Sequence, residues 1–538
     1  PSLFLTTIVQ LVYSPKERVQ SSATSALIAV LKYNNDKVGV LCMVLDSLSN
    51  LCEGKVSVKE EGPKLEPDRV LRLIAKWAKS VGDWNFLVGP LIDKMFAEPS
   101  NAIIVKFLSC ISEHLVDAVD VVLNRVLLQM RVQNEMNGNF LTNWEGAKVS
   151  AVVSTQMQQA LFDRLCPLLI LRMLPLRVFS DLKSSVMYSQ PLAKNAVLYN
   201  ADINAIDQDC VAGLLLHRAL SKFEFEDVRK LAAELCGRIH PQVLFPSICS
   251  HLEHAVISQD ILKIKACLFS ICTSLVVRGM DSVSHPLLVK IRKLLENILL
   301  WPSLDGDEVS KAQHGCIDCL ALMICTELYR MDSLEDFNFD KMTIVGGNDH
   351  VDTATKMSVL DHVIHQLAQD DNILVSHLRF HHGNSPNDAP VPAPFRLCMA
   401  NVLISACQKI SDSGKKPFAW KMLPRLIHFL EATKDSVIRA ACIQVMFSAV
   451  YHLKSAVLPY SSNLLTISLS FLEKGSDQER MAAAKLLASL MASEDVVVKS
   501  ISGGLLGVRS LLSSICSKDT SAELQQVCRT LLECVSLR

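Results

Sequence analysis

The sequence predicts an all-α fold, a right-handed α–α superhelix built from stacked helix pairs. Apolar residues recur at three- and four-residue spacing along most of the 538 residues, which is the spacing of one helix face. Aromatic residues make up only 6% of the chain, so it is poor in the side chains that sheets favour. Similar helix pairs return along the chain, and each pair needs a neighbour to bury its apolar side.

The stretch 423–450 shows the repeated unit most clearly. Leu423 and Leu426 belong to the apolar face of a first helix. Asp435 or Ser436 can cap the second helix by accepting a hydrogen bond from its free N–H groups. The second helix carries alanines among its apolar residues, and their small side chains let a neighbouring helix approach closely.

The other elements follow in chain order. Pro15 suits the first turn of the second helix, where its missing N–H costs nothing. Pro167 and Pro175 argue against one straight helix through the apolar stretch 165–182. The predicted helices are 2–13, 15–30, 36–51, 68–81, 84–96, 101–114, 117–133, 149–164, 212–222, 227–239, 243–254, 260–277, 287–300, 309–328, 354–378 and a regular series from 395 to the C-terminus.

Four stretches rich in Gly, Pro, Asn or charge predict exposed loops: 53–67, 133–146, 331–353 and 379–395. Because loops on rigid scaffolds carry function, they are candidates for partner-specific contacts. The predicted domains are N-terminal helical repeats (1–132), an irregular helical segment with loops (133–208), central repeats (209–330), a loop-rich insertion around one helical segment (331–395) and C-terminal repeats (396–538).

The charge balance argues against nucleic acid as a partner. The formal net charge is −1, whereas a nucleic-acid binder needs a basic excess or stripe to replace phosphate counterions. Apolar runs such as 165–171 and 266–277 are shorter than the roughly 18 residues that span a bilayer, so we expect no membrane insertion. The 18 cysteines mostly lie in apolar helical patterns, which predicts reduced thiols in an intracellular protein, cytoplasmic or nuclear.

No catalytic, cofactor-binding or metal-binding residue is predicted. Cys316 and Cys319 form a CxxC, which could be half a zinc site or a redox pair. The pair lies mid-helix without a second CxxC, which favours two core-facing thiols. Phosphate loops, dinucleotide turns and nucleophile elbows are absent from the sequence, and Gly503-Gly504 indicates a helix end or kink.

Six histidines gather loosely in the second half of the chain: His350, His362, His365, His377, His381 and His382. His362 and His365 are three residues apart on a predicted helix and could share a metal with His381 or His382. No HExxH spacing accompanies them, so solvated histidines are the favoured interpretation.

Corresponding positions recur at a drifting period of 33 to 47 residues. Asp227 to Asp260 is a step of 33 (260 − 227), and Asp260 to Asp307 is a step of 47 (307 − 260). At a step of 41, Arg439 falls on Arg480. The best matches combine arginine with small residues early in the second helix: SVIRAACIQVM, QERMAAAKLLASLM, DVRKLAAELCGRI and SPKERVQSSATSALIAV. This pattern resembles the HEAT and armadillo repeat superfamily of α-solenoids.

The resemblance covers most of the chain, and the overall texture is similar to large armadillo-type proteins of plants. It implies a scaffold or adaptor, because most members of the superfamily act in that way. Armadillo proteins that bind extended peptides carry a ladder of asparagine and tryptophan. Here the tryptophans do not recur at the repeat period, which argues against importin-like peptide capture: Trp77, Trp84, Trp144, Trp301 and Trp420.

We therefore predict a non-enzymatic scaffold or adaptor that binds protein partners through an extended surface, with the second helices lining the concave side. It requires no cofactor and no small-molecule substrate. The alternative is a regulatory segment of a larger enzyme or nucleic-acid-associated assembly. The chain begins at Pro1 without methionine, so we expect a fragment, which permits that alternative. A metalloenzyme using the histidines would require stoichiometric zinc or iron.

Overall fold

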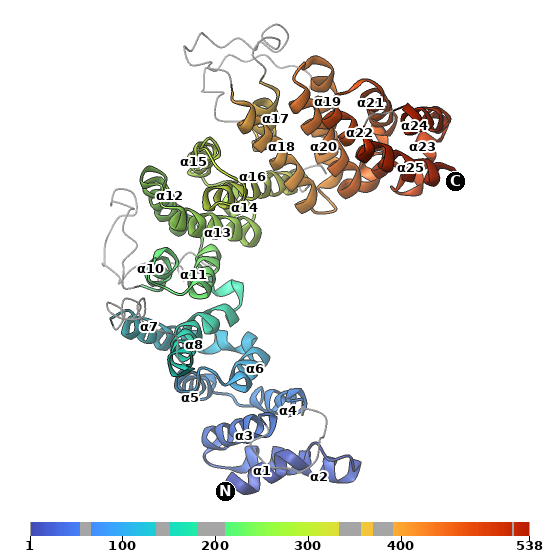
Figure 1. Cartoon of the computed structure of the whole chain (residues 1–538). Helices are drawn as coiled ribbons and strands as arrows, with labels where there is room; N and C mark the ends of the chain where they lie inside the picture. Colours follow the sequence, from blue (N-terminus) through green and yellow to red (C-terminus); the bar gives the residue numbers. More distant parts are fainter. Residues whose placement is uncertain are drawn as a thin grey trace, which may run out of the picture. The chain divides into compact units, whose positions relative to one another are not determined.

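The structure, a computed structural model, describes residues 2–53, 66–135, 151–179, 210–332, 357–369, 391–518 and 521–536. Over these ranges the chain forms α-helices and short 3₁₀ helices and no strand, as the sequence predicts. It divides into two compact units, Pro1–His251 (unit 1) and Leu252–Arg538 (unit 2) (Figure 1). The finer division into five domains stays a prediction.

Unit 1 consists of successive helix pairs. The first helices are α1 (Ser2–Leu11), α3 (Lys37–Cys52), α5 (Trp84–Ala97), α7 (Val119–Glu135) and α10 (Val211–Leu220). The second helices are α2 (Glu17–Tyr33), α4 (Asp68–Ala78), α6 (Ala102–Cys110), α8 (Ala151–Met173) and α11 (Glu226–Arg238). The 3₁₀ helices are η1 (Ser112–Ala118) and η3 (Leu176–Phe179). Within the unit, α4 packs against both α2 and α6, and α8 packs against α11.

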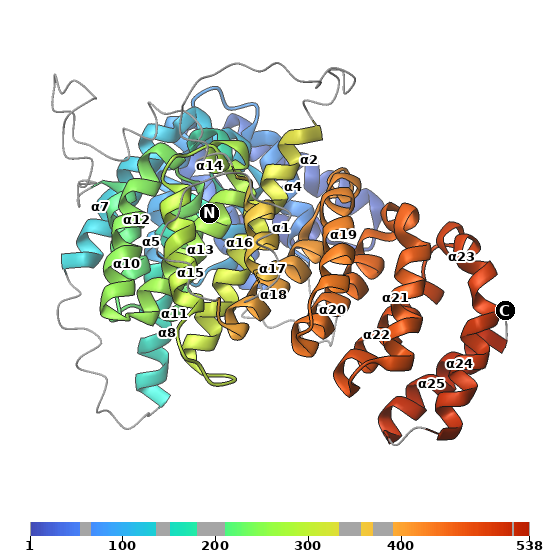
Figure 2. The ribbon, with the colours of Figure 1, turned by 90° about the horizontal axis from the view of Figure 1, so that it is seen from above.

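Unit 2 continues the same order after α12 (Pro241–Ser258), which contains the boundary. Its second helices form one row, each packed on the next: α13 (Ile261–Arg278), α16 (Glu308–Asp332), α18 (Ala393–Lys409), α20 (Ser436–Leu453), α22 (Asp477–Met491) and α25 (Ala522–Ser536). The first helices are α15 (Leu288–Leu299), α17 (Val359–Ala368), α19 (Lys415–Ala432), α21 (Ser461–Lys474) and α24 (Leu505–Lys518) (Figure 2). Short connectors complete the unit: α14 (Met280–Val283), η6 (Lys454–Tyr460), α23 (Asp495–Ile501) and η7 (Ser502–Gly504).

An arginine closes four of the helix pairs. Arg229, Arg396, Arg439 and Arg480 are each the fourth residue of a second helix. Each donates to a main-chain carbonyl in, or just after, the last turn of the preceding helix: Glu224, Leu367, Thr433 and Leu472. The carbonyls of Leu367, Thr433 and Leu472 lie at helix C-termini and lack a partner within their own helix, so the arginine replaces the missing hydrogen bond. Glu224 lies in the turn between α10 and α11. The described helix pairs therefore form an α-solenoid, as the sequence predicts.

The stacking buries small and branched side chains together. Cys442, Val445 and Ala449 of α20 and Ala483 and Leu487 of α22 have no more than 1% of their surface exposed. The alanines bring the two helix axes close, as the sequence predicts for the stretch 423–450. A fully buried valine or leucine side chain contributes roughly 1.5–3 kcal/mol, so the stability of the solenoid arises mainly along this row.

The predicted cap at Asp435 and the predicted helix start near Asp260 are confirmed, and one predicted helix start is wrong. Asp435 caps α20 by accepting from Val437 N–H at 2.9 Å, and Asp260 caps α13. The prediction for Pro15 is wrong, since α2 begins at Glu17. The stretch 165–182 is not one straight helix, as predicted: α8 contains Pro167 but ends at Met173, before Pro175, and η3 follows. Proline removes one hydrogen-bond donor, and the packing of α8 against α7 and α11 offsets that loss.

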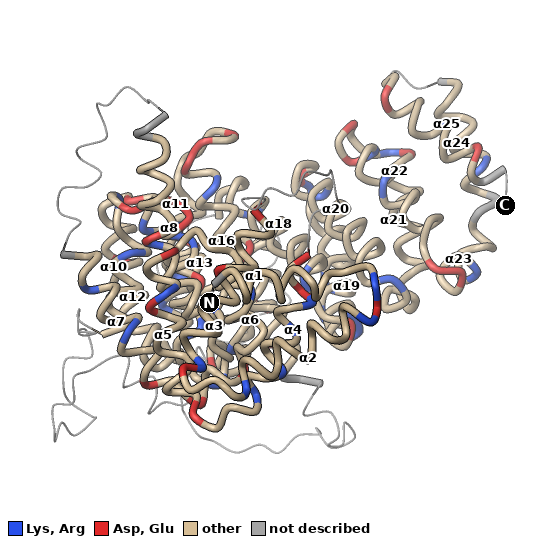
Figure 3. The backbone as a smooth tube through the Cα atoms, turned by 90° about the horizontal axis from the view of Figure 1, so that it is seen from below, with Lys and Arg blue, Asp and Glu red and all other residues tan. Residues whose placement is uncertain are grey.

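One helical run in the described part of the chain, Ser436–Lys474, is long and apolar enough to cross a membrane by length and composition alone. Half of its apolar window is buried inside the protein. The run is interrupted where α20 ends at Lys454, whose φ is 55°. The expectation of no membrane insertion stays a prediction. Basic and acidic residues are interspersed along the helices (Figure 3).

Candidate protein-binding surface

The second helices of unit 2 present a repeated outward face, here called the outer face. It lies across α18, α20 and α22. The arginines that close the pairs set its register, because Arg396, Arg439 and Arg480 are 43 and 41 residues apart (439 − 396 and 480 − 439). A residue five positions further along lies about 140° around the helix, away from the first helix of the pair. That position is exposed or half-buried in all three helices: Asn401, Gln444 and Lys485.

Each helix contributes five residues to the outer face at intervals of three and four. All are exposed or half-buried: Pro394, Leu397, Asn401, Ile404 and Gln408; Val437, Ala440, Gln444, Phe447 and Tyr451; Gln478, Met481, Lys485, Ala488 and Ala492. Lys485 is the single charged residue in this set. Amide side chains lie between apolar ones, so the outer face offers hydrogen-bonding groups and apolar contact area together. That combination, with charge excluded, is typical of the centre of a protein–protein interface.

The outer face ends in a groove. A cavity of about 490 Å³ lies where α18, α20 and α22 end, and Gln408, Tyr451 and Ala492 of the outer face line it. Tyr451 is 66% exposed, and its ring centroid lies 6.4 Å from that of Phe447. A large exposed aromatic beside a cavity is the kind of group that anchors a partner side chain.

Basic groups line the groove next to these helix ends. Lys415, His452 and Lys454 contribute to its wall. Burial, followed by the nearby charge of Lys415, lowers the pKa of His452, so the imidazole is neutral at neutral pH. Lys454 has a φ of 55°, a left-handed conformation that residues other than glycine seldom adopt. The groove therefore ends at a strained residue, as ligand-contacting surfaces often do.

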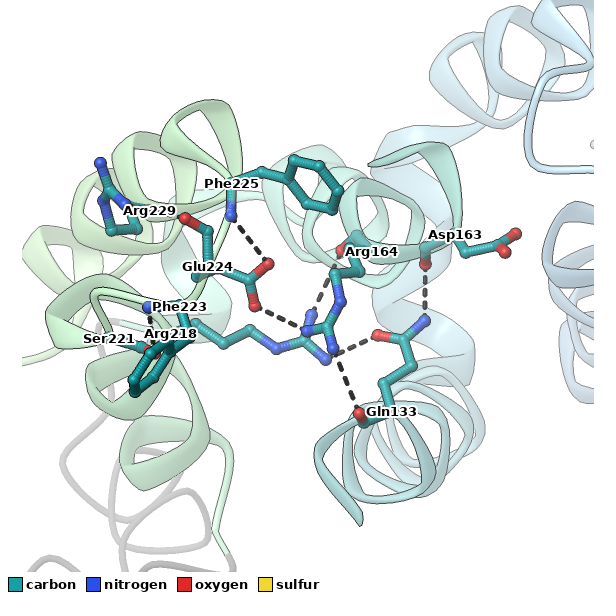
Figure 4. A network of polar contacts seen from close by, with 9 residues as sticks. All are labelled: Gln133, Asp163, Arg164, Arg218, Ser221, Phe223, Glu224, Phe225 and Arg229. Atoms are coloured by element: carbon teal, nitrogen blue, oxygen red, sulfur yellow. Dashed lines mark hydrogen bonds and ion pairs between the residues drawn. The ribbon is translucent and has the colours of Figure 1, made fainter. Parts of the chain in front are cut away.

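A buried polar network joins α7, α8 and α10 in unit 1 (Figure 4). Arg164 Nη1 donates to Glu224 Oε2 at 2.6 Å, and Arg218 Nη2 donates to Gln133 Oε1 at 2.6 Å. Arg218 is 1% exposed, and burial, followed by the nearby charge of Arg164, lowers its pKa to about 10. The members bind one another and are closed to solvent, so the network holds the helices together and offers no site for a substrate.

A charged cluster lies between α15, α16 and α17 in unit 2. Glu327 Oε2 accepts a hydrogen bond at 2.8 Å from the N–H of Val359, the first residue of α17. Burial raises the pKa of Glu327 to about 7, against the lowering effect of that hydrogen bond. His362 Nε2 of α17 lies 2.8 Å from Glu296 Oε1 of α15. These contacts attach α17 to its neighbours at its first turn.

The structure confirms that Cys316 and Cys319 lie on the buried side of α16. Both thiols have no exposed surface. Burial raises the pKa of Cys316, and a hydrogen bond with Cys272 and then burial raise that of Cys319. Protonated, enclosed thiols are neither nucleophiles nor ready metal ligands, so the CxxC is a packing feature.

The histidines are brought together only in part. His362 and His365 lie in α17, as predicted, while His350, His377, His381 and His382 lie outside the described residues. Within the described ranges, no group of three or more His, Cys, Asp or Glu side chains could hold a metal ion. The four predicted loops also lie largely outside those ranges, so their role as contact sites stays a prediction.

The tryptophans do not line the outer face. Trp77 is 7% exposed, whereas Trp420 of α19 is 57% exposed, on the first-helix side of its pair. Trp84 stacks on His114 with ring centroids 4.7 Å apart. Trp144 lies outside the described residues. The described tryptophans therefore form no periodic row.

Arg396 and, with it, the outer face were not predicted from the sequence. The step of 43 residues from Arg396 to Arg439 is present in the sequence and could have revealed the third copy. It was hidden because the irregular stretch 379–395 separates α18 from its first helix, α17, so the usual short turn between the two helices of a pair is missing.

No family model matches the chain, and no curated protein matches it. Among solved structures, an engineered protein (structural genomics target OR497) is 11% identical, with a TM-score of 0.29 over 99% of this chain and 98% of that one. Kap121p bound to Nup53p is 10% identical, with a TM-score of 0.39 over 98% of this chain and 44% of that one. The Kap95:Nup1 complex is 10% identical, with a TM-score of 0.35 over 99% and 68%. The chain thus spans about half the length of Kap121p, and its fold assignment rests on its own helix pairs.

Proposed function

We propose that this chain is a non-enzymatic scaffold or adaptor whose outer face binds a protein partner. The observation that carries the proposal is the register of the outer face, in which fifteen residues at matching positions of α18, α20 and α22 include a single charge. Core packing does not require exposed positions to avoid charge, whereas a desolvated interface does.

The groove supplies a specific anchoring point on this surface. Tyr451 and the cavity beside it lie at one end of the outer face, so a partner that follows the helix row would reach them. Tyrosine is among the residue types that carry a disproportionate share of binding energy at protein interfaces. We therefore assign Tyr451 as the main contact residue and Gln444 as an orienting hydrogen-bonding group.

The eighteen cysteines support an intracellular location for this activity. All are free thiols in the structure. Reduced cysteines persist in the cytosol and nucleus, while oxidising compartments convert accessible ones to disulfides. The partner is accordingly an intracellular protein.

Proximity labelling in intact cells tests the proposal with matched variants. Gln444→Glu combined with Tyr451→Glu places two charges on the outer face, and Trp420→Glu places one on the opposite side of the same repeat. The wild type and Trp420→Glu should label the same set of neighbours, and the outer-face variant should lose part of that set. If all three proteins label the same neighbours, the outer face is not the binding surface.

A further inference from the structure

The second helices of unit 1 present a surface of a different chemistry. At the intervals of the outer face, α4 and the residue after it carry four exposed basic side chains, here called the basic face: Arg69, Arg72, Lys76 and Lys79. The opposite side of α4 is apolar, with Val70, Leu71 and Ile74 fully buried. The helix is thus divided into a core side and a cationic side.

The basic face has few counter-charges among the described residues, and Glu66 and Asp68 lie at one end of it. None of its four side chains forms an ion pair or side-chain hydrogen bond among the described residues. The adjoining helix α2 offers hydroxyl groups, with Ser21 and Ser25 exposed, and α6 adds the exposed Lys106. Solenoid surfaces normally intersperse acids with bases, as α11 does where Lys230 pairs with Glu226. An unbalanced cationic strip therefore requires another explanation.

A cavity lies beneath the basic face. Its volume is about 570 Å³, and Arg69, Arg72 and Lys76 line it together with Tyr13 and Thr24. Burial raises the pKa of Tyr13 to about 12, so the phenol adds no negative charge at neutral pH. The two acids on the wall, Glu66 and Asp68, lie at the start of α4, at one end of the cationic row.

We propose that the basic face is a docking surface for a short acidic segment of a protein, rich in aspartate or glutamate. From Arg69 to Lys79 the row is about 15 Å long, at 1.5 Å per residue. Side chains on one side of an extended chain repeat every 6.6–7 Å, so about three carboxylates fit along it. Arginine binds a carboxylate through two parallel hydrogen bonds, so the contact fixes the orientation of the carboxylate in addition to balancing its charge.

Nucleic acid fits this surface less well. A duplex presents one charge per roughly 1.7 Å on two strands, and proteins that bind it neutralise roughly six to ten phosphates. The basic face offers four cations on one helix, and the chain as a whole has a net charge of −1. This surface is independent of the outer face of unit 2, so either can fail without the other.

Fluorescence anisotropy on the whole chain tests the proposal. The probe is a fluorescein-labelled hexapeptide of alternating glutamate and serine, with alternating lysine and serine as the opposite-charge control. We expect saturable binding of the acidic peptide that weakens as salt rises, and a loss of about tenfold in affinity for Arg72→Glu combined with Lys76→Glu. The matched variant Lys434→Glu with Arg509→Glu makes the same charge change at exposed sites in unit 2 and should bind as the wild type does.

Three results would overturn the proposal. These are equal binding of the two peptides, an equal loss in the matched variant, or tighter binding of a single-stranded oligonucleotide of the same charge. Circular dichroism of each variant separates lost binding from lost folding. Should Arg72→Glu with Lys76→Glu unfold, Arg72→Gln with Lys76→Gln replaces it, with the same direction of effect expected.

Discussion

Arg439 of α20 donates from Nε to Oε1 of Glu479 in α22 at 2.5 Å, and this pair links two successive repeats. The same arginine donates to the Thr433 carbonyl within its own repeat. Glu479 in turn accepts from Ser476 N–H at 2.6 Å in the capping box of α22. Burial raises the pKa of Glu479, but these hydrogen bonds outweigh it and hold the pKa below its usual range. One ion pair therefore closes a repeat, caps the next helix and joins the two.

Replacing Arg439 with leucine should lower the free energy of unfolding by about 2 kcal/mol. Glu479 is 1% exposed, and it would lose its counter-charge while staying buried. Urea unfolding followed by circular dichroism measures the change. The exposed Lys485→Leu is the control and should stay within about 0.5 kcal/mol of the wild type. A similar loss in the two variants would show that the pair contributes no specific stability.

Replacing Glu224 with alanine should lower the free energy of unfolding by about 3–5 kcal/mol. The buried guanidinium groups of Arg164 and Arg218 would lose the carboxylate that offsets their charge. Glu226→Ala provides the control two residues away, since its ion pair with Lys230 is about two-thirds exposed on each side and is screened by solvent. Hydrogen exchange should show faster opening of α8 and α10 in Glu224→Ala alone. Unchanged exchange there would contradict the structural role of the network.

Replacing Glu327 with glutamine should stabilise the chain at pH 8 and leave it unchanged near pH 4. The folded pKa of about 7 lies above the unfolded value of about 4.5, so the folded state retains the proton between those values. Stability is therefore lost as pH rises from about 4.5 to 7, and a neutral side chain avoids that loss, worth about 3 kcal/mol. Arg292, Asp361 and Lys421 face the same carboxyl group.

Thermal unfolding at both pH values tests this expectation, with the exposed Glu431→Gln of α19 as the control. The expected outcome is a higher midpoint at pH 8 for Glu327→Gln only. A lower midpoint at pH 8 would mean that the ionised carboxylate, through its bond to Val359 N–H, stabilises α17 more than burial penalises it.

Thiol labelling of the native chain should modify Cys110 and Cys534 and spare Cys316 and Cys319. The first two are exposed, whereas the CxxC thiols are enclosed and their pKa values are raised, which disfavours the reactive thiolate. Mass spectrometry after brief maleimide treatment, with and without urea, separates the two classes. Native labelling of Cys319 at the rate of Cys110 would restore the redox interpretation of the CxxC.

The sequence predicted the architecture well because two local signals agree with the tertiary packing. The apolar spacing gives each helix its buried side, and Asp435 and Asp260 begin their helices where capping chemistry requires. Pro167 is the counterexample, since packing outweighs a local preference there. The outer face was not predictable in the same way. Its residues occupy matching, solvent-accessible positions of the three helices, but they are not of one side-chain type that a sequence pattern would show.

Charge contacts between distant residues were also beyond the sequence. Nothing in the local pattern of Arg164 or Glu224 shows that they meet, because 60 residues and two helix ends separate them. Arg439 and Glu479 are 40 residues apart, close to the repeat step, and a search for opposite charges at that step would have found them. The repeat period thus allows contacts between adjacent repeats to be predicted from the sequence. It gives no information on contacts that depend on an irregular turn.

The row from α13 to α25 has a mechanical consequence. Each helix of the row packs against the helices directly before and after it, and the row has no shared core that all of its helices contact. Under tension applied at its two ends, unit 2 should first extend elastically and then unfold one repeat at a time. A bound partner would then experience the tension as a change in the distance between its contact sites.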